Sequence, residues 1–245
     1  MIEVQDLHKR LGTQEVLRGL NLSIIRGQTC VVLGRSGCGK SVLLKHLIGL
    51  MQPTKGSVLI DGENISVLPE KQLLKVRRKV GMLFQSGALF DSMTVEQNLE
   101  FPLREQGLRD KKDLKDRVVE ALDMVDLAGA EKKLPENLSG GMRKRVGLAR
   151  TIVGRPGCIL YDEPTTGLDP ITSDSINHLI RRLQRRLNVT SVVVTHDMKT
   201  AFHCADHVVM LHEGQVYFSG TIDELQTSTD PVITDFIEGR SGDAD

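Results

Sequence analysis

A glycine-rich segment near the N-terminus carries the residue types of a phosphate-binding loop. Its residues fit the pattern G-x-x-x-x-G-K-[ST] and are Gly34, Arg35, Ser36, Gly37, Cys38, Gly39, Lys40 and Ser41. The glycines let the backbone curl, so that successive N–H groups can point at phosphate oxygens. The Lys40 ammonium can reach the β- and γ-phosphates, and the Ser41 hydroxyl can ligate Mg²⁺. A simple glycine-rich turn would leave Lys40 and Ser41 unexplained, so the segment predicts a nucleotide site.

Two carboxylates follow an apolar run about 120 residues after this loop. The run over residues 159–161 ends at Asp162 and Glu163. At the end of a strand, Asp162 would lie near the metal ion, and Glu163 could polarise a water for attack on the γ-phosphate. A capping pair before Pro164 would explain the two acids only in part. Together with the phosphate loop, they predict hydrolysis of the bound nucleotide.

A third segment has the features of a second anion site. Ser139, Gly140 and Gly141 begin a predicted helix and expose backbone N–H groups at its positive end. A single chain with one phosphate loop hardly needs two phosphate sites. In a head-to-tail pair, however, this face of one copy would cover the γ-phosphate held by the other copy. The alternative is an ordinary helix N-cap with a tight turn, which is the simpler explanation of the segment taken alone.

Alternating strands and helices must position these segments. Apolar runs and period-two alternation predict strands over residues 20–24, 29–33, 57–60, 80–84, 158–161 and 192–194. Apolar residues at helical spacing predict helices over 41–50, over 176–187 and through most of 88–154. The pattern predicts an α/β fold with a mostly parallel sheet, an N-terminal antiparallel β subdomain and an inserted helical subdomain. We divide this single domain into a core of residues 1–87 and 155–220, a helical part at 88–154 and a C-terminal extension at 221–245.

Composition argues against several other classes of protein. The 245 residues include 32 Lys plus Arg and 32 Asp plus Glu, so the formal net charge is zero and a generic nucleic-acid binder is disfavoured. Apolar residues make up 40% of the chain and aromatic residues 3%, which fits a globular protein without a base-stacking surface. The four cysteines form no C-x-x-C pair and no His pair has finger spacing, so the spacing predicts no zinc site.

The ordered set of motifs strongly resembles the ATP-binding subunits of ABC transporters over residues 1 to about 220. In chain order, the set is the phosphate loop, Gln85, Leu138-Ser139-Gly140-Gly141, Asp162-Glu163, Gly167-Leu168-Asp169 and His196. The resemblance implies a RecA-like P-loop NTPase that binds ATP and Mg²⁺. It also implies a homodimer closed by ATP and attached to transmembrane permease subunits.

The resemblance assigns roles to residues that would otherwise be unremarkable. Gln85 would sense Mg²⁺ and the permease, Asp169 would bridge the two copies, and His196 would contact the γ-phosphate and hold the attacking water. The implied catalytic set is Glu163, His196, Gln85 and Lys40. The implied metal-binding set is Ser41, Gln85 and Asp162.

Two positions depart from the family pattern. Family members usually carry an aromatic residue that stacks on adenine, and the matching position here is Leu11. Adenine would then be held more weakly, or with help from Arg18 or another side chain. The residue after Gly141 is Met142 rather than the commoner Gln, which puts one polar contact between the two copies in doubt.

Further segments resemble the Mla/Mce-linked branch of the family, which moves phospholipids or related lipids across the bacterial envelope. These segments are residues 86–95, Asn98, 101–103, 162–171 and 230–239. The branch implies a permease dimer, an Mce-type substrate-binding protein and often a STAS-domain partner. It places the chain peripherally, at the cytoplasmic face of the inner membrane.

Other functions would account for part of the sequence. An ATPase of an amino-acid importer or of a cell-division system is the first alternative, and residues 230–239 favour lipid transport over it. A non-transport ABC ATPase of DNA repair or translation would usually carry a second nucleotide domain, coiled coils or zinc modules. A purely regulatory nucleotide-binding module would not need Glu163 and His196.

Two groups of surface residues have more than one interpretation. Leu89, Phe90 and Met93 form an apolar cluster that fits a permease interface, or equally well packing between the helical part and the core. The basic residues at 143–145 and 181–186 suggest a lipid or nucleic-acid surface. Since they lie on the polar faces of amphipathic helices, we expect a solvated face instead.

Overall fold

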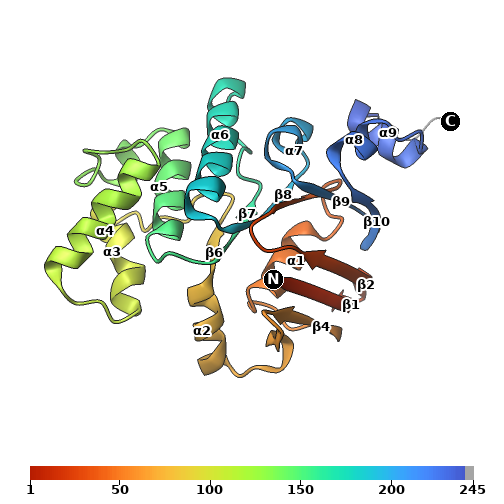
Figure 1. The fold of residues 1–245 in the computed structure, drawn as a ribbon, viewed down its shortest axis with the longest axis horizontal. Coiled ribbons are helices and arrows are strands. Elements are labelled where there is room, and N and C mark those ends of the chain that lie inside the picture. Colours follow the sequence, from red (N-terminus) through yellow and green to blue (C-terminus); the bar gives the residue numbers. More distant parts are fainter. Residues whose placement is uncertain (241–245) are drawn as a thin grey trace.

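The computed structural model describes residues 1–240, and within them it has two β-sheets and a set of covering helices (Figure 1). The N-terminal sheet has the strand order β2-β1-β4-β5 and is antiparallel. Its strands are β1 (Ile2–Leu11), β2 (Gln14–Ile24), β4 (Lys55–Ile60) and β5 (Glu63–Asn64). Their apolar residues alternate toward one side, as the pattern over 20–24 predicted.

The second sheet has the strand order β10-β9-β3-β8-β7-β6. Its strands are β3 (Thr29–Leu33), β6 (Val80–Leu83), β7 (Cys158–Asp162), β8 (Thr190–Thr195), β9 (His207–His212) and β10 (Gln215–Gly220). All neighbours pair in parallel except β9 and β10, which form an antiparallel hairpin. Every residue of β3 and β8 is buried, which agrees with the unbroken apolar runs.

Helices cover this second sheet on both faces. The described helices are α1 (Lys40–Leu47), α2 (Glu70–Lys79), α3 (Val95–Glu105), α4 (Lys111–Met124), α5 (Gly140–Ile152), α6 (Pro170–Leu187), α7 (Met198–Cys204), α8 (Ile222–Gln226) and α9 (Pro231–Glu238), with 3₁₀ turns at Ile65–Val67 and Pro135–Asn137. Alternate residues of β3 point into two cores. Val31 packs in the core that contains residues of α5, α6 and α7, and Val32 packs in the core that contains α1 and the N-terminal sheet.

This architecture confirms the predicted fold class. The antiparallel sheet, the mostly parallel sheet and a separate group of helices α3, α4 and α5 occupy different parts of the molecule (Figure 1). The boundaries after residues 87 and 154 stay predictions. Residues 241–245 of the predicted C-terminal extension lie outside the described residues. Among the described helices, none combines the length and apolar character that a membrane crossing requires.

Candidate nucleotide site

The sequence-predicted residues converge at the carboxyl edge of the second sheet. Strands β3, β6, β7 and β8 are parallel, so the segments that follow them meet at one edge. A pocket of about 400 Å³ opens there. It is lined by Val16, Ser36, Gly37, Gly39, Lys40, Ser41, Val42, Gln85, Glu163, Thr166 and His196. The fold therefore brings Gln85, Glu163 and His196 next to the phosphate loop, and the roles assigned to them stay predictions.

The phosphate loop requires glycine at its start and at the beginning of α1. A Cβ on Gly34 would lie 2.6 Å from the Leu211 carbonyl oxygen, too close for any side chain. Gly39 has a φ of +106°, which side chains rarely adopt, and precedes the first residue of α1. Lys40 is only 6% exposed, and its Nζ donates to the Gly34 and Arg35 carbonyl oxygens at 2.7 and 3.1 Å. These bonds hold the ammonium within the loop that would surround a phosphate.

Ser41, which lines the pocket, lies beside Asp162 at the end of β7. The Ser41 hydroxyl donates to Asp162 Oδ1 at 2.9 Å. Burial raises the pKa of Asp162, and the negative charge of Glu163 acts in the same direction, while the Ser41 bond opposes them. A divalent cation would relieve this unfavourable environment of the carboxylate. Hydroxyl, carboxylate and amide oxygens are the donors that Mg²⁺ prefers, so Ser41, Asp162 and Gln85 fit that ion.

Glu163 is held in place by its backbone and by three side chains. Its φ is +47°, a conformation that non-glycine residues seldom adopt and that commonly marks functional sites. Its carboxylate accepts hydrogen bonds from the hydroxyls of Thr166 and Thr195, both at 3.3 Å. His196 Nδ1 lies 3.0 Å from the same carboxylate. The Lys40 ammonium lies 3.7 Å away, so Glu163 faces the space between the phosphate loop and His196.

Lys144 is a site residue that the sequence did not reveal. It was expected on a solvated face, but it is 5% exposed, and that expectation is wrong. Its Nζ donates to the Gln85 carbonyl oxygen and to the Glu163 carbonyl oxygen, the latter at 3.2 Å. Burial lowers the pKa of Lys144, and the charges of Asp162 and Glu163 oppose that change. Lys144 thus ties α5 to the two loops that carry Gln85 and Glu163.

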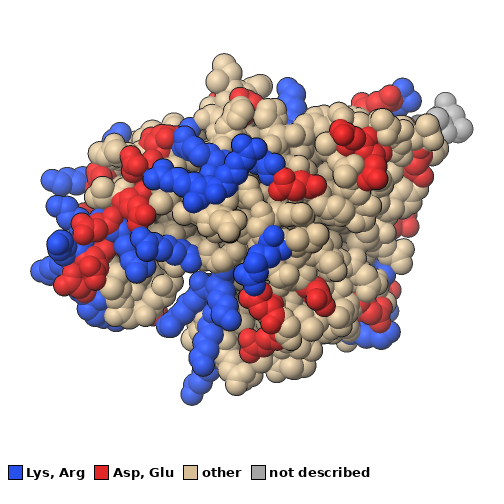
Figure 2. All heavy atoms as spheres, viewed as in Figure 1, with Lys and Arg blue, Asp and Glu red and all other residues tan. Residues whose placement is uncertain are grey.

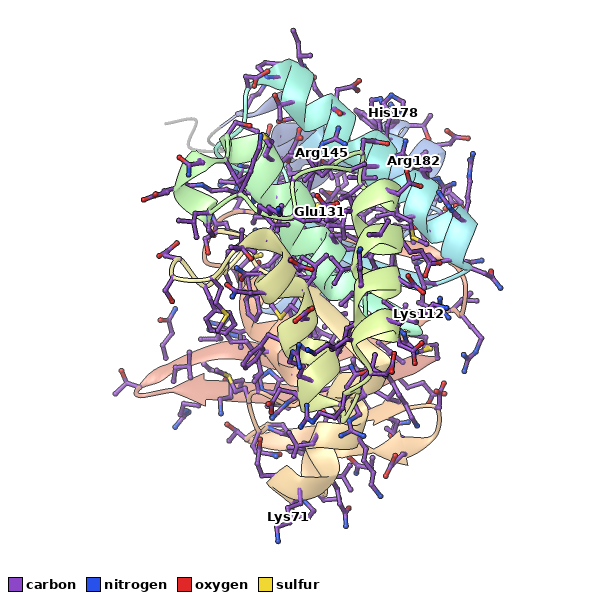
Figure 3. The ribbon with its side chains drawn as sticks, turned by 90° about the vertical axis from the view of Figure 1, so that its left-hand side faces the viewer. Lys71, Lys112, Glu131, Arg145, His178 and Arg182 are labelled. Atoms are coloured by element: carbon purple, nitrogen blue, oxygen red, sulfur yellow. The ribbon has the colours of Figure 1, made fainter. Side chains whose placement is uncertain are left out.

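Of the other basic residues in the two groups, four lie at the surface, whereas Arg145 and Arg181 are half-buried. Arg143, Arg182, Arg185 and Arg186 are exposed, as expected. Figure 2 shows Lys and Arg side chains gathered over the α6 region. Arg145 and Arg182, which Figure 3 labels, both bind Asp126 Oδ2, at 2.7 and 2.6 Å. These pairs lower the pKa of Asp126, so part of the positive charge is neutralised within the chain.

The Ser139 segment lies outside the pocket of its own chain. Ser139 is exposed and caps α5, accepting a hydrogen bond from the Met142 N–H at 3.3 Å. A Cβ on Gly141 would lie 2.6 Å from Thr172 on α6, so this glycine permits close packing of α5 on α6. Asp169 caps α6 and accepts bonds from the N–H groups of Ile171 and Thr172 at 3.0 Å. Hydrogen bonds from Thr172 lower the pKa of Asp169, so it is an exposed anion beside the Ser139 segment.

The adenine position is the least defined of the predicted features. Leu11 is the last residue of β1 and is 43% exposed. Leu11 is not among the described residues that line the pocket. Val16 of β2 lines the pocket instead. Cys38, in the phosphate loop, is half-buried, and burial raises the pKa of its thiol.

An apolar groove of about 420 Å³ lies beside the helical part. Its aromatic and cationic lining includes Phe84, Phe90, Phe101, Arg77, Arg78 and Arg150. The rings of Phe90 and Phe101 lie 5.0 Å apart and both residues are more than 40% exposed. Leu89 instead packs against the core, so the expected apolar cluster is divided between core packing and an open surface.

Asn98 shapes the loop that presents Phe90. This asparagine is fully buried on α3. Its Oδ1 accepts from the Phe90 N–H at 2.8 Å, and its Nδ2 donates to the carbonyl oxygens of Phe90, Met93 and Thr94 at 3.0–3.1 Å. A buried amide with every bond satisfied holds one loop conformation. Phe90 is therefore a fixed feature of the groove.

Comparisons with known proteins agree with this geometry. The family model described as ABC transporter matches residues 17–166. The "Intermembrane phospholipid transport system ATP-binding protein MlaF" of Haemophilus influenzae is 39% identical over 98% of this chain and 91% of that protein. The "Probable ribonucleotide transport ATP-binding protein mkl" of Mycobacterium leprae is 43% identical over 98% of this chain and 69% of that protein.

Solved structures give the same assignment. The dimeric ATP-binding cassette MJ0796, in a post-hydrolysis state bound to ADP and Pi, is 33% identical with a TM-score of 0.83, covering 91% of this chain and 99% of that one. The cbiO1 protein of Clostridium perfringens, part of the ABC transporter complex cbiONQ, is 29% identical with a TM-score of 0.85, covering 96% and 94%. With its phosphate loop and Glu163 in one pocket, the chain thus belongs to the ABC transporter family, as one of its ATP-binding, ATP-hydrolysing subunits.

Proposed function

We propose that two copies of this chain form the motor of a transporter that moves phospholipid across the bacterial envelope. The observation that supports a two-copy motor is that two phosphate-binding features lie apart from each other within one chain. The pocket contains the phosphate loop and Glu163, whereas Ser139 lies outside it. A second copy placed head to tail would bring its Ser139 segment over the γ-phosphate.

The polar residues in and around the pocket have separate tasks in this proposal. The phosphate-loop N–H groups and Lys40 bind the β- and γ-phosphates, and Ser41, Asp162 and Gln85 hold Mg²⁺. The ion, when bound, neutralises charge on the phosphates. Glu163 accepts a proton from the attacking water, and His196, 3.0 Å from its carboxylate, orients that water toward the γ-phosphate. By donating to both carbonyl oxygens, Lys144 holds the backbones of Gln85 and Glu163 at a fixed separation.

ATP performs work because it binds the closed dimer better than the open one. In the closed form the nucleotide contacts two copies, and in the open form it contacts one. A ligand shifts a conformational equilibrium only by its difference in affinity for the two forms. Hydrolysis and phosphate release remove that difference, so the dimer reopens.

The groove beside Phe90 is the proposed attachment site for the transmembrane subunits. It combines exposed aromatic rings with a rim that includes Arg77, Arg78 and Arg150. Its loop is continuous with Gln85, which lines the nucleotide pocket. A segment docked in the groove would therefore move with the closing pocket. The chain would then sit peripherally at the cytoplasmic face of the inner membrane.

The choice of phospholipid rests on relatives and on the resemblance of residues 86–95 and 230–239. The relative from Haemophilus influenzae is named for intermembrane phospholipid transport and is covered over 91% of its length. The Mycobacterium leprae relative, named for ribonucleotide transport, is slightly more identical but is covered over 69%. Ribonucleotide transport is thus the second candidate. An Mce-type protein and a STAS-domain protein are the further partners we propose.

Purification from membranes tests this function. The tagged chain is isolated in mild detergent, and mass spectrometry identifies its partner subunits and its bound small molecules together. We expect transmembrane subunits and phospholipid. Ribonucleotide bound outside the ATP sites would support the second candidate, and a chain that carries neither membrane partner nor cargo would contradict both.

A matched pair of variants tests the groove. Phe90→Asp should abolish recovery of the transmembrane subunits, because it places a charge in the apolar groove. Phe202→Asp is the control, since Phe202 on α7 is equally exposed and lies outside the groove. Equal loss of partners from the two variants would exclude this groove as the attachment site.

A further inference from the structure

Two helices meet at a cluster of metal-ligating side chains outside the nucleotide pocket. Asp174 and His178 lie one helical turn apart on α6, and His203 lies on the neighbouring helix α7. His178 Nε2 is 3.5 Å and His203 Nε2 is 3.2 Å from the two Asp174 carboxylate oxygens. One ligand atom of each residue lies within 4.8 Å of the others. The ring of His178, which Figure 3 labels, lies 5.3 Å from the ring of His203.

The hydrogen bonds of His203 fix which nitrogen faces the cluster. His203 Nδ1 lies 2.9 Å from the Lys199 carbonyl oxygen, which can only accept, so Nδ1 carries a proton. In the neutral ring, Nε2 then presents a lone pair to Asp174 at 3.2 Å. Two acceptors face each other across that distance, and a cation between them would remove their repulsion. A metal-bound histidine commonly makes this same Nδ1 bond to a backbone carbonyl.

We propose that Asp174, His178 and His203 bind one divalent transition-metal ion, with Zn²⁺ as the best fit. Two imidazoles and one carboxylate are ligands for zinc and similar ions, whereas Mg²⁺ and Ca²⁺ prefer oxygen alone. Ligand bonds of about 2.0–2.1 Å in a tetrahedron place neighbouring donor atoms about 3.3 Å apart. His203 Nε2 lies 3.2 Å from Asp174 Oδ1 and His178 Nε2 lies 3.5 Å from Oδ2, so each imidazole is close to that edge length from one carboxylate oxygen.

The exposure of the cluster and the pairing of nearby cations leave room for this ion. The three side chains are 39–70% exposed, so the imidazoles can turn the short way needed to close around a metal, and water can supply the fourth ligand. Two cations on α6 that line one pocket with His178 are already paired, Arg181 with Asp206 at 2.7 Å and Arg182 with Asp126 at 2.6 Å. The cysteine and histidine spacing did not reveal this site, because its ligands come from two helices that are brought together only by folding.

The ion would join two helices that leave the nucleotide pocket. Helix α6 begins directly after Asp169, and α7 begins two residues after His196. A metal that cross-links the helices would hold these two residues at a fixed separation. This consequence rests on the proposed function, but binding of the ion does not.

Zinc binding to the nucleotide-free, chelator-treated chain tests the proposal. Competition with a chromophoric zinc chelator measures stoichiometry and affinity. We expect the wild type to bind one more equivalent of Zn²⁺ than His203→Ala, or to bind it at least about tenfold more tightly. Zinc should also slow hydrogen exchange in residues 198–204 of the wild type and leave exchange in His203→Ala unchanged.

Further variants separate this site from other zinc ligands. Asp174→Asn and His178→Ala should lose the same equivalent, whereas His212→Ala, outside the cluster, should keep it. Circular dichroism without metal checks that all variants are folded. Equal zinc binding by the wild type and the three cluster variants would overturn the proposal, because the cluster would then contribute no ligand to the ion. ATP hydrolysis is not part of this test, so its outcome is independent of the proposed function.

Discussion

The chain contains two glycine-rich helix starts, and only one of them belongs to a complete site. At the start of α1, Gly39 has a φ of +106°, which side chains rarely adopt, Lys40 is buried, and Glu163 lies 3.7 Å from the Lys40 ammonium. At the start of α5, Ser139 and Gly140 are exposed, and Ser139 bonds only to its own helix. The first site is built for a ligand within one chain, whereas the second offers N–H groups to a partner. This difference is the reason to expect a dimer.

Glu163→Gln should give the largest effect on the complete site. The amide cannot accept the proton of the attacking water, so ATP hydrolysis should fall by at least about 100-fold, while nucleotide binding is retained. Phosphate release and equilibrium binding of labelled ATP measure the two quantities. A variant that hydrolyses ATP at the wild-type rate would show that Glu163 is not the base.

Ser139→Ala should affect only the incomplete site. It removes one hydrogen bond to a charged phosphate from across the dimer, worth about 1.5–3 kcal/mol, so hydrolysis should fall at least about tenfold. ATP affinity of the isolated chain should not change. Thr94→Ala is the matched control, because Thr94 caps α3 in the same way but has no role at the nucleotide. If both variants lose the same activity, the effect of Ser139 is only that of a helix cap.

Lys144→Met should have a smaller effect that connects the two helix starts. The substitution keeps an unbranched side chain, shorter by one atom, but removes the bonds from α5 to the Gln85 and Glu163 carbonyl oxygens. We expect hydrolysis to fall by roughly 3- to 10-fold and stability by about 1–3 kcal/mol, because two carbonyl groups lose their donor. Urea unfolding and phosphate release measure the changes. Arg143→Met, at the exposed neighbouring position, should change neither quantity.

The sequence predicted the complete site well because that site depends on local pattern. Gly34, Lys40 and Ser41 lie in one loop, and the apolar run before Asp162 locates the other edge. Lys144 could not be predicted, since a lysine on an amphipathic helix looks the same whether its polar face meets solvent or a carbonyl pair. Nor did spacing reveal α7, which is seven residues long and has too few turns for a periodic signal.

Without nucleotide, Asp162→Asn should change stability by the smallest amount of these variants. Burial raises the pKa of Asp162, so folding favours its neutral form. The associated stability is present below the ordinary pKa and is lost as pH rises through the folded pKa. At pH 7 and without nucleotide, the variant should therefore be more stable than wild type, by less than about 1 kcal/mol. Thermal unfolding should show this gain shrinking toward pH 4, and a loss of stability at pH 7 would contradict it.

Light scattering of Glu163→Gln with saturating Mg-ATP tests the central claim most directly. If each nucleotide needs the Ser139 segment of a second copy, the particle should have twice the 27.1 kDa of one chain, and Ser139→Ala in the same background should return it toward one. Particles of 27.1 kDa alone, even with the transmembrane subunits supplied, would contradict the account.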